Sequence, residues 1–446
     1  MKRYLTHETR RFERTQVHAL PCPSAPEMQL VKVYPHVTFQ EIVGFGGALT
    51  EAAGYVYALM EKPLQQEFMQ LYFGDAGNRY SLGRLSVQSC DFSLCPRSYV
   101  ASARDKSLAE FSIDDDFAYI IPFVLDALAV NPALEFLASP WSPPAWAKSN
   151  RSMKRGGHLL SKHYRQWANM IARFVAEYRK LGIPVTRLTM QNEPGAVQTW
   201  ESCLFNVAQE GVFLRDHLKP ALRYAGLRDV KVLGWDHNKE SALERTIGLL
   251  GDARTADELD GIAFHWYSGD HFEALRIVRD LLGPRRELIF SEGCDAYSAG
   301  DPTQELPHAE HYAHEIIGDL EAGANGILDW NILLDEQGGP NHVGNFCDAP
   351  VMFDRSSGKL NVRLPYYYLG HFSRFIQPGA RRVLSTSYTT NLETCAFLNP
   401  DGSHALVVLN RWWWSIPFKL TWGSGALDRR IATIEAPPHS IQTITW

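Results

Sequence analysis

The sequence lacks paired cysteines, long apolar runs and a leader-like amino terminus. Its seven cysteines are an odd number, and none stands in a CxxC pair, so neither a disulfide framework nor a zinc ribbon is expected. No window approaches the roughly 18 consecutive apolar residues of a membrane span. The opening MKRYLTHETRRFERTQ has basic residues without an apolar segment behind them, unlike a secretory signal. These absences predict a cytoplasmic protein without a membrane span.

An excess of charge of one sign is also lacking. The formal net charge is -6 and 21% of the residues are charged, as in ordinary globular proteins. Neither sign dominates enough to indicate nucleic acid or an anionic membrane as a partner. No GxGxxG or GxxxxGKS motif follows an apolar run, so dinucleotide and nucleoside triphosphate binding lose their main support. The sequence therefore predicts no cofactor.

Apolar runs bounded by turn residues are present, and eight of them predict strands in the first three quarters of the chain. Segments with helical spacing separate them, most clearly residues 164 to 182, which Gly182 and Pro184 terminate. Alternating strands and helices predict a parallel sheet that is covered on both faces. Eight repeats favour a (β/α)₈ barrel, over residues 41 to 376. The runs are 41 to 47, 80 to 88, 134 to 140, 185 to 191, 230 to 236, 259 to 267, 286 to 292 and 325 to 331.

The last part of the chain has a different texture. Short alternating runs at 405 to 410, 417 to 422, 430 to 435 and 440 to 446 are separated by Gly, Pro, Asp and Asn, a pattern typical of a β-sandwich. The run MQLVKVYP (28 to 35) precedes the barrel and is too short to form a domain. A chain of 446 residues exceeds a single core of about 250 to 300 residues. We therefore expect residues 1 to 40 and 377 to 446 to build one small sandwich domain.

Two glutamates end predicted barrel strands. Glu193 follows the fourth strand in TMQNEP, and Glu292 ends the seventh in FSEGC. Because strands four and seven lie on opposite sides of an eight-stranded ring, the two carboxylates can face one another at the carboxyl-terminal mouth, where barrel active sites lie. Two opposed carboxylates are what glycoside hydrolysis requires. Taken singly, each glutamate could also be a helix cap or an ion-pair partner.

Other polar and aromatic residues reach the same mouth. Asp91 and Trp141 follow the second and third predicted strands, and Trp330 lies near the end of the eighth. An aspartate can hold two sugar hydroxyls and an aromatic ring can cover a sugar face. The alternatives are a turn or helix cap for Asp91 and core packing for the two tryptophans.

Several motifs, in order, resemble family 30 of the glycoside hydrolases, the glucosylceramidase family. The resemblance runs from about residue 41 to residue 376. The motifs are GFGGALTEAAG (44 to 54), SCDFS (89 to 93), SPWSPPAW (139 to 146), QNEP (191 to 194), FHWY (264 to 267), SEGC (291 to 294) and DWNILLDEQGGPN (329 to 341).

The resemblance implies roles for individual residues. Glu193 would be the general acid/base and Glu292 the nucleophile of a retaining mechanism, with Asn192 contacting the sugar 2-hydroxyl. Asp91 and Trp141 would hold the outer hydroxyls. The other residues that the resemblance places in the site are His265, Tyr267, Trp330 and Asn345.

Elementary electrostatics adds an expectation about the proton. Two carboxylates close together cannot both ionise easily, so one keeps its proton near neutral pH. We expect Glu193 to be the protonated member. Tyr267 is expected to donate a hydrogen bond to Glu292 and to help keep it ionised.

Two other classes of function compete with a two-carboxylate glycosidase. The segment HAEHYAH spaces His308, His311 and His314 at intervals of three, which would suit a metal-dependent barrel hydrolase if the third imidazole did not drift around the helix face. A solvated helix face is the simpler interpretation, and no metal is predicted. The second competitor is a barrel that binds sugar without cleaving it.

Two sequence differences near the site bear on which substrate the protein accepts. The segment GAVQTWESC follows NEP, and Ile327 stands where animal glucosylceramidases carry a tryptophan, which argues against a ceramide substrate, although the resemblance connects the chain with sphingolipid metabolism. A cytoplasmic enzyme would meet small imported β-glycosides or oligosaccharides. We expect β-glucosides, with β-xylosidase, β-fucosidase and β-1,6-glucanase activities as alternatives.

Overall fold

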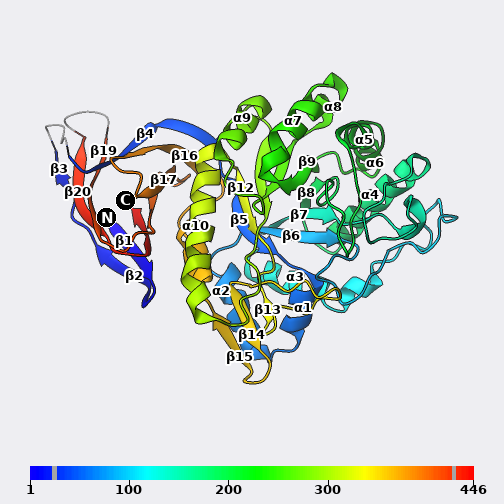
Figure 1. Ribbon diagram of the computed structural model, residues 1–446, viewed down its shortest axis with the longest axis horizontal. Coiled ribbons are helices and arrows are strands. Elements are labelled where there is room, and N and C mark those ends of the chain that lie inside the picture. Colours follow the sequence, from blue (N-terminus) through cyan, green and yellow to red (C-terminus); the bar gives the residue numbers. More distant parts are fainter. Residues whose placement is uncertain (23–27, 424–427) are drawn as a thin grey trace.

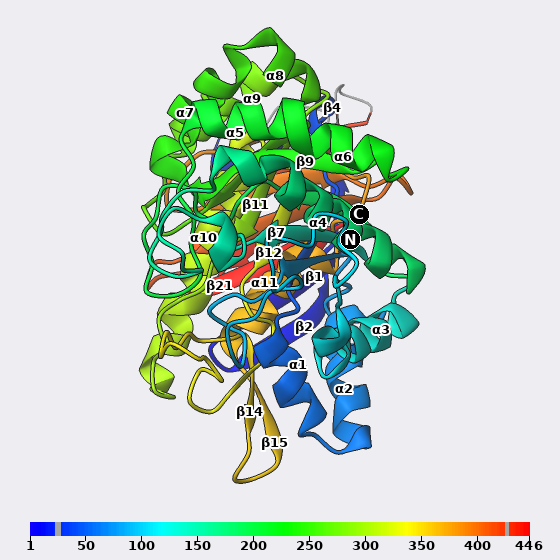
Figure 2. The same cartoon turned by 90° about the vertical axis from the view of Figure 1, so that its right-hand side faces the viewer.

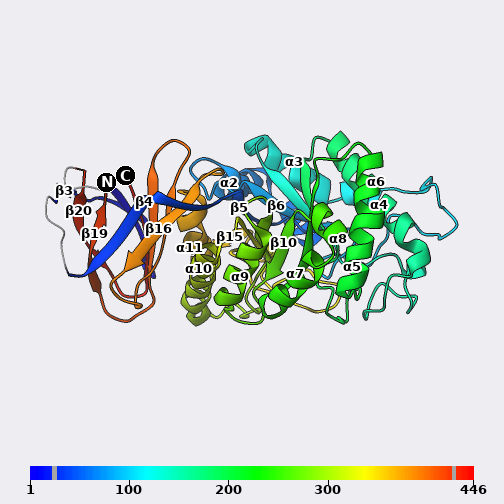
Figure 3. The ribbon, with the colours of Figure 1, turned by 90° about the horizontal axis from the view of Figure 1, so that it is seen from above.

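The chain folds into two units that lie side by side, a barrel and a β-sandwich (Figure 1). The computed structural model describes residues 1–22, 28–423 and 428–446. Helices α10 (Glu305–Ala322) and α11 (Leu364–Ser373) stand between the units (Figure 3) and contact strands of the sandwich. None of the described helices combines the length and apolar character that crossing a membrane requires.

Eight parallel strands within the described residues close into a barrel, in the order β10, β11, β12, β5, β6, β7, β8, β9. Each overlaps one of the eight predicted runs, so the predicted barrel is confirmed. Strands such as β10 are buried along their whole length, because helices cover the outside and side chains fill the inside. The strands are β5 (Gly44–Ala48), β6 (Leu82–Val87), β7 (Glu135–Pro140), β8 (Val185–Thr189), β9 (Lys231–Asn238), β10 (Gly261–His265), β11 (Glu287–Glu292) and β12 (Gly326–Asp329).

The barrel interior changes from apolar to polar toward the carboxyl ends of its strands. Alternate residues of a strand point to the same face, so Arg84, Ser139 and Ser291 form the next level beyond the apolar layer; all three are buried. This polar level lies directly beneath the mouth of the barrel. The apolar layer consists of Leu82, Leu137, Leu233, Ala263, Ile289 and Leu328.

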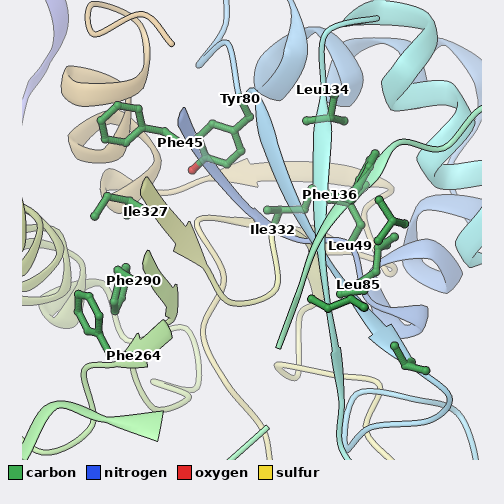
Figure 4. Close-up of a cluster of buried hydrophobic side chains, with 14 of the residues drawn as sticks. Phe45, Leu49, Tyr80, Leu85, Leu134, Phe136, Phe264, Phe290, Ile327 and Ile332 are labelled. Atoms are coloured by element: carbon green, nitrogen blue, oxygen red, sulfur yellow. The ribbon is translucent and has the colours of Figure 1, made fainter. Parts of the chain in front are cut away.

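Helices pack their apolar faces on the outside of the strands. Helix α4 (Tyr164–Lys180) buries Trp167 and Phe174 and is followed by Gly182 at a φ of +82°, close to the predicted end. Figure 4 shows outer-face side chains of neighbouring strands, including Phe264 and Phe290, in the cluster that these helices cover. The other α-helices among the described residues are α1 (Glu51–Ala58), α2 (Lys62–Phe73), α3 (Ile120–Val130), α5 (Val207–Phe213), α6 (Lys219–Tyr224), α7 (Ala242–Leu250), α8 (Ala253–Glu258) and α9 (Phe272–Leu282).

A small three-stranded sheet follows the last barrel strand. It consists of β13 (Leu334–Asp335), β14 (Val351–Asp354) and β15 (Lys359–Val362). The β14–β15 hairpin projects from one end of the molecule (Figure 2). The loop between β13 and β14 carries Asn345 and Cys347 back to the mouth of the barrel.

The sandwich is one curled sheet in the order β2, β1, β21, β18, β17, β16, β4, β19, β20, β3. Its core includes Val31, Val408 and Phe418. The expected pairing of amino-terminal with carboxyl-terminal strands is confirmed, because β1 pairs with β21 and β4 with β16, both antiparallel. The strands are β1 (Lys2–His7), β2 (Arg10–Gln16), β3 (Leu20–Pro21), β4 (Leu30–Glu41), β16 (Arg381–Ser387), β17 (Glu393–Leu398), β18 (His404–Asn410), β19 (Ile416–Trp422), β20 (Arg430–Ala436) and β21 (Ser440–Thr445).

The amino-terminal segment contributes more strands than the single run expected from the sequence. Strand β2, RRFERTQ, has no buried residue, so it lacks the apolar alternation that marks a strand in the sequence. It forms by backbone pairing with β1. On the other side of β1, His371 of α11 lies 2.9 Å from the hydroxyls of both Thr6 and Thr443, which ties β1 and β21 to the barrel.

Candidate active site

Glu193 and Glu292 meet at one end of the barrel. Glu292 is the last residue of β11, and Glu193 lies in the loop after β8 with a φ of +46°, a conformation uncommon outside glycine. The backbone N–H of Glu193 donates to the carbonyl of Asp236 over 2.9 Å, which fixes the loop. The Nδ1 atom of His265 is 3.7 Å from Oε1 of Glu193 and 3.9 Å from Oε1 of Glu292. Both carboxylates therefore converge on a single buried imidazole.

Glu292 is held by two donors. Arg84 forms an ion pair with its Oε2, and the hydroxyl of Tyr267 donates to its Oε1 over 3.0 Å, the hydrogen bond expected from the sequence. Both contacts favour the ionised carboxylate. They also fix its orientation at the mouth of the barrel.

Arg84 organises the polar level beneath the mouth, and sequence reasoning missed it. Its fully buried guanidinium donates to Asp236 Oδ2 at 2.9 Å and to Asn192 Oδ1 at 2.9 Å. A buried cation needs such partners because burial removes its hydration. The available signal was one arginine inside the apolar run YSLGRLSVQ.

Asp236 is the fixed anion of this network, and it orients His265. It accepts hydrogen bonds from Thr189 and Ser291, each at 2.6 Å, and its Oδ1 lies 3.1 Å from Nε2 of His265. Burial acts to lower the pKa of His265, but Glu292, Asp236 and Glu193 outweigh it and raise the pKa to about 9. At neutral pH the imidazole is therefore positively charged.

The charged imidazole reverses the expected order of the two glutamates. Burial acts to raise the pKa of Glu193, but His265, His237 and Gln198 outweigh it and lower the pKa to about 2. For Glu292 burial prevails over His265 and Arg84, and the pKa is raised. The expectation that Glu193 is the protonated member is wrong, because the proton of the cluster resides on His265.

The predicted site residues gather around one cavity of about 370 Å³. The exception is His265, which is fully buried beneath it and contacts both glutamates. The predicted residues that line the cavity are Asp91, Trp141, Asn192, Glu193, Tyr267, Glu292, Trp330 and Asn345.

One side of the cavity combines a carboxyl group with two stacked indoles. The rings of Trp141 and Trp330 lie 5.3 Å apart at an angle of 21°. Asp91 accepts a hydrogen bond from Asn345 at 3.0 Å through Oδ2, while its buried Oδ1 has no hydrogen-bond partner among the described residues. Burial first, and Glu292 next, raise the pKa of Asp91 to about 7 despite that hydrogen bond. An oxygen placed in this way suits a hydroxyl donor of a ligand.

Asn192 faces the same space. Because its side-chain oxygen accepts from Arg84 at 2.9 Å, its amide N–H groups are left for a ligand acceptor. The backbone N–H of Asn192 donates to Pro140 at the end of β7. The side chain is thus positioned by two neighbouring strands.

The opposite side of the cavity has residues that sequence reasoning did not assign. Gln198 donates to Oε2 of Glu193 at 3.1 Å, and Nδ1 of His237 lies 3.7 Å from its Oε1. Trp200 and Phe346 line the outer part. Gln198 and Trp200 belong to GAVQTWESC, whose departure from the animal enzymes was the only available signal.

The three histidines of HAEHYAH do not form a metal site in the described structure. Each lies on α10 next to a different acidic residue: His308 beside Asp348, His311 beside Asp295, and His314 beside Glu393. Among the described residues, the group whose ligand atoms lie close enough to hold one ion is Glu193, His237 and His265.

Comparison with known proteins accounts for nearly the whole chain. The model of the glycosyl hydrolase family 30 TIM-barrel domain matches residues 42–376, and that of the family 30 β-sandwich domain matches residues 379–444. The lysosomal acid glucosylceramidase of Mus musculus is 32% identical over 94% of this chain and 83% of its own.

Two solved structures are similar over the whole chain. SrfJ from Salmonella typhimurium superimposes with a TM-score of 0.95 at 38% identity, covering 100% of this chain and 99% of its own. An endo-β1,6-glucanase superimposes with a TM-score of 0.87 at 25% identity, with the same coverage of both chains.

Proposed function

The chain belongs to glycosyl hydrolase family 30, and from that premise we propose that it hydrolyses β-glucosides with retention of configuration, using Glu292 as nucleophile and Glu193 as acid/base. The observation that carries the assignment is the convergence of both carboxylates on His265, at 3.7 and 3.9 Å. Glu292 takes the nucleophilic role because the ion pair with Arg84 and the hydrogen bond from Tyr267 fix its carboxylate at the mouth of the barrel. Glu193 lies on the side of Gln198 and Trp200, where the leaving group would depart.

His265 supplies the proton in the first step. Glu292 attacks the anomeric carbon and the bond to the aglycone oxygen breaks, while Glu193 passes a proton from His265 Nδ1, 3.7 Å away, to that oxygen. In the second step Glu193 removes a proton from water and returns it to His265. The new bond from water to the anomeric carbon releases Glu292 as a carboxylate, and two inversions give net retention.

The glycone side of the cavity favours glucose. The free oxygen of Asp91, the amide of Asn345 and the stacked Trp141 and Trp330 provide polar groups around the sugar edge and an aromatic face. A cavity of about 370 Å³ suits one sugar ring and the start of an aglycone. The substrate class that follows is a small β-glucoside or oligosaccharide rather than an internal segment of a polymer.

A β-1,6-linked glucan is the second candidate substrate. The similar endo-β1,6-glucanase structure and the aromatic side chains of Trp200 and Phe346 beyond Glu193 favour it. A second sugar ring can stack on such side chains.

The test is a panel of aryl β-glucoside, xyloside, fucoside and galactoside together with a β-1,6-linked glucan, with the anomer of the first product followed by NMR. The proposal expects glucoside cleavage with the β-anomer released first, and its loss in Glu292→Gln. Cleavage confined to the glucan would replace the small-glucoside assignment. Release of the α-anomer, or full activity of Glu292→Gln, would refute the mechanism.

We also propose a reducing compartment, the cytoplasm. Six cysteines form no disulfide: Cys90, Cys95, Cys203, Cys294, Cys347 and Cys395. Cell fractionation tests the location; recovery of the protein with secreted or vesicular fractions would contradict it.

A further inference from the structure

We propose that Glu193, His237 and His265 form a binding site for a divalent transition-metal ion of the zinc class, and that an ion bound there blocks hydrolysis. One ligand atom from each residue lies within 4.8 Å of the other two. Oε1 of Glu193 is 3.7 Å from Nδ1 of both histidines. The three side chains come from β9, β10 and the loop after β8, so the barrel brings together residues that the sequence keeps apart.

The donor set fits the chemistry of zinc. Two imidazole nitrogens and one carboxylate oxygen are ligands that zinc takes at about 2.0 to 2.2 Å. Two atoms bound to one ion at those lengths lie at most about 4 Å apart, so the 3.7 Å separations from Glu193 need only a small adjustment. Calcium and magnesium prefer sets of oxygen ligands, which this cluster does not offer.

The Nδ1 atoms of His237 and His265 face the carboxylate of Glu193 at 3.7 Å, an ion-pair separation that is longer than a hydrogen bond. Nδ1 of His237 and Nδ1 of His265 have no hydrogen bond among the described residues. His265 is completely inaccessible, so its Nδ1 has no solvent to bind instead. Each nitrogen is therefore available to an ion placed between it and the carboxylate of Glu193.

Asp236 prepares His265 for this role. It lies 3.1 Å from Nε2 of His265 and is itself fixed by Arg84 and Ser291. A carboxylate on the far nitrogen is the usual support of a metal-bound histidine, because it orients the ring and directs the other nitrogen to the ion. An ion at Nδ1 displaces the proton of His265 to solvent.

The cavity gives the ion access and explains its effect. Glu193 and His237 both line the cavity wall, so a fourth coordination position faces the cavity and can hold water. An ion on Oε1 of Glu193 prevents that carboxylate from exchanging protons with a leaving group. The inhibitory part of the inference rests on the proposed function, whereas the binding part does not.

Titration with Co²⁺, which gives visible absorption bands in zinc sites, tests the binding part directly. The intact chain should bind one Co²⁺ ion, and the visible bands should have the high intensity that is typical of an ion with few ligands. His237→Gln should weaken binding by more than the about 10- to 100-fold that loss of an outer-shell partner causes. The matched control is His36→Gln, which removes an exposed imidazole of β4 on the sandwich and should bind as the intact chain does.

The outcomes separate this inference from the proposed function. Absence of Co²⁺ binding in the intact chain, or unchanged binding in His237→Gln, overturns the site. The second measurement is the inhibition of aryl β-glucoside hydrolysis by Zn²⁺, with each protein compared with its own metal-free rate. The Zn²⁺ concentration that halves the rate should be at least tenfold lower for the intact chain and for His36→Gln than for His237→Gln. Co²⁺ binding by a chain that has no glycosidase activity would refute the proposed function but not the metal site. If Zn²⁺ did not slow hydrolysis by the intact chain, the inhibitory role of the bound ion would be refuted, and the proposed glycosidase function would stand.

Discussion

Arg84 donates to Oδ2 of Asp236 over 2.9 Å at a depth where neither side chain is exposed to solvent. The pair joins β6 to β9 across the inside of the barrel, and Arg84 continues to Glu292 while Asp236 continues to His265. Through these two residues, each of the proposed catalytic glutamates is connected to the interior of the fold. The active site and the polar level of the barrel core are thus one structure.

Replacing Arg84 should therefore damage stability and activity together. Arg84→Met removes the buried cation that pairs with both Asp236 and Glu292, which costs about 3 to 5 kcal/mol of the free energy of unfolding. Activity should disappear because Glu292 also loses its ion pair. Urea unfolding measures the first effect. Arg10→Met, which breaks an exposed pair with Glu13, is the control and should change stability by less than about 1 kcal/mol. Equal unfolding curves for the two variants would contradict the role of Arg84.

Removing the hydroxyl of Tyr267 should shift the acidic limb of the pH profile. Tyr267→Phe deletes a 3.0 Å hydrogen bond to Glu292, and loss of a donor disfavours the ionised carboxylate, so its pKa rises further. A hydrogen bond to a charged group is worth about 1.5 to 3 kcal/mol, or roughly one to two pH units. The acidic limb of kcat/KM should move to higher pH by that amount.

Tyr388→Phe is the matched control, because its hydroxyl donates to a backbone carbonyl on the sandwich. Its pH profile should coincide with that of the intact chain. A Tyr267→Phe profile that also coincides would mean that the hydroxyl does not tune Glu292.

The carboxyl group of Asp91 should lower the stability of the folded protein above neutral pH and strengthen the binding of substrate. Its folded-state pKa is raised from 3.8 to about 7, so the folded protein binds this proton more tightly and loses stability as the pH rises from about 4 through 7. At pH 8 the buried charge costs roughly 4 kcal/mol at about 1.36 kcal/mol per pKa unit. Asp91→Asn should therefore raise the urea midpoint at pH 8 and have little effect near pH 4, while the KM for a glucoside increases.

The exposed Asp115 provides the comparison. Asp115→Asn should leave both the urea midpoint and KM unchanged at either pH. If Asp91→Asn destabilised the protein at pH 8 as much as at pH 4, the buried charge would not be the cost assigned to it.

The loss of activity in Glu193→Gln should depend on how easily the leaving group departs. Without an acid the aglycone departs unassisted, so kcat/KM should fall by about 10²- to 10⁴-fold for an alkyl glucoside. An aryl glucoside whose phenolate leaves easily should be much less affected in the glycosylation step. A series of aryl leaving groups of graded acidity measures the dependence. Equal losses across the series would assign Glu193 a role other than acid catalysis.

The sequence predicts which residues lie at the site better than it predicts which of them carries the proton. Glu193 and Glu292 could be placed at the mouth because strand ends follow from apolar runs, and the family motifs supplied the sugar-side residues. Arg84 escaped notice because nothing in a single strand indicates which distant carboxylates a buried cation will meet. The proton could not be assigned to His265 for the same reason, since its pKa depends on Glu193, Asp236 and Glu292, which only the closed barrel brings together.

The sandwich shows a similar limit. Strands with buried alternate residues, such as β20, were predicted, but the exposed and charged β2 could not be. Its position depends on β1, which in turn depends on β21.

The pairing of β1 with β21 sets the order in which the molecule is assembled. Lys2 lies opposite Thr445, so β1, which pairs on one side with β2 close behind it in the chain, gains its neighbour on the other side only when β21 has been synthesised. The barrel strands pair mainly with partners close behind them in the chain, and contacts of short sequence separation form sooner. We therefore expect the barrel to fold before the sandwich during synthesis, because the sandwich is complete only once β21 is available to pair with β1.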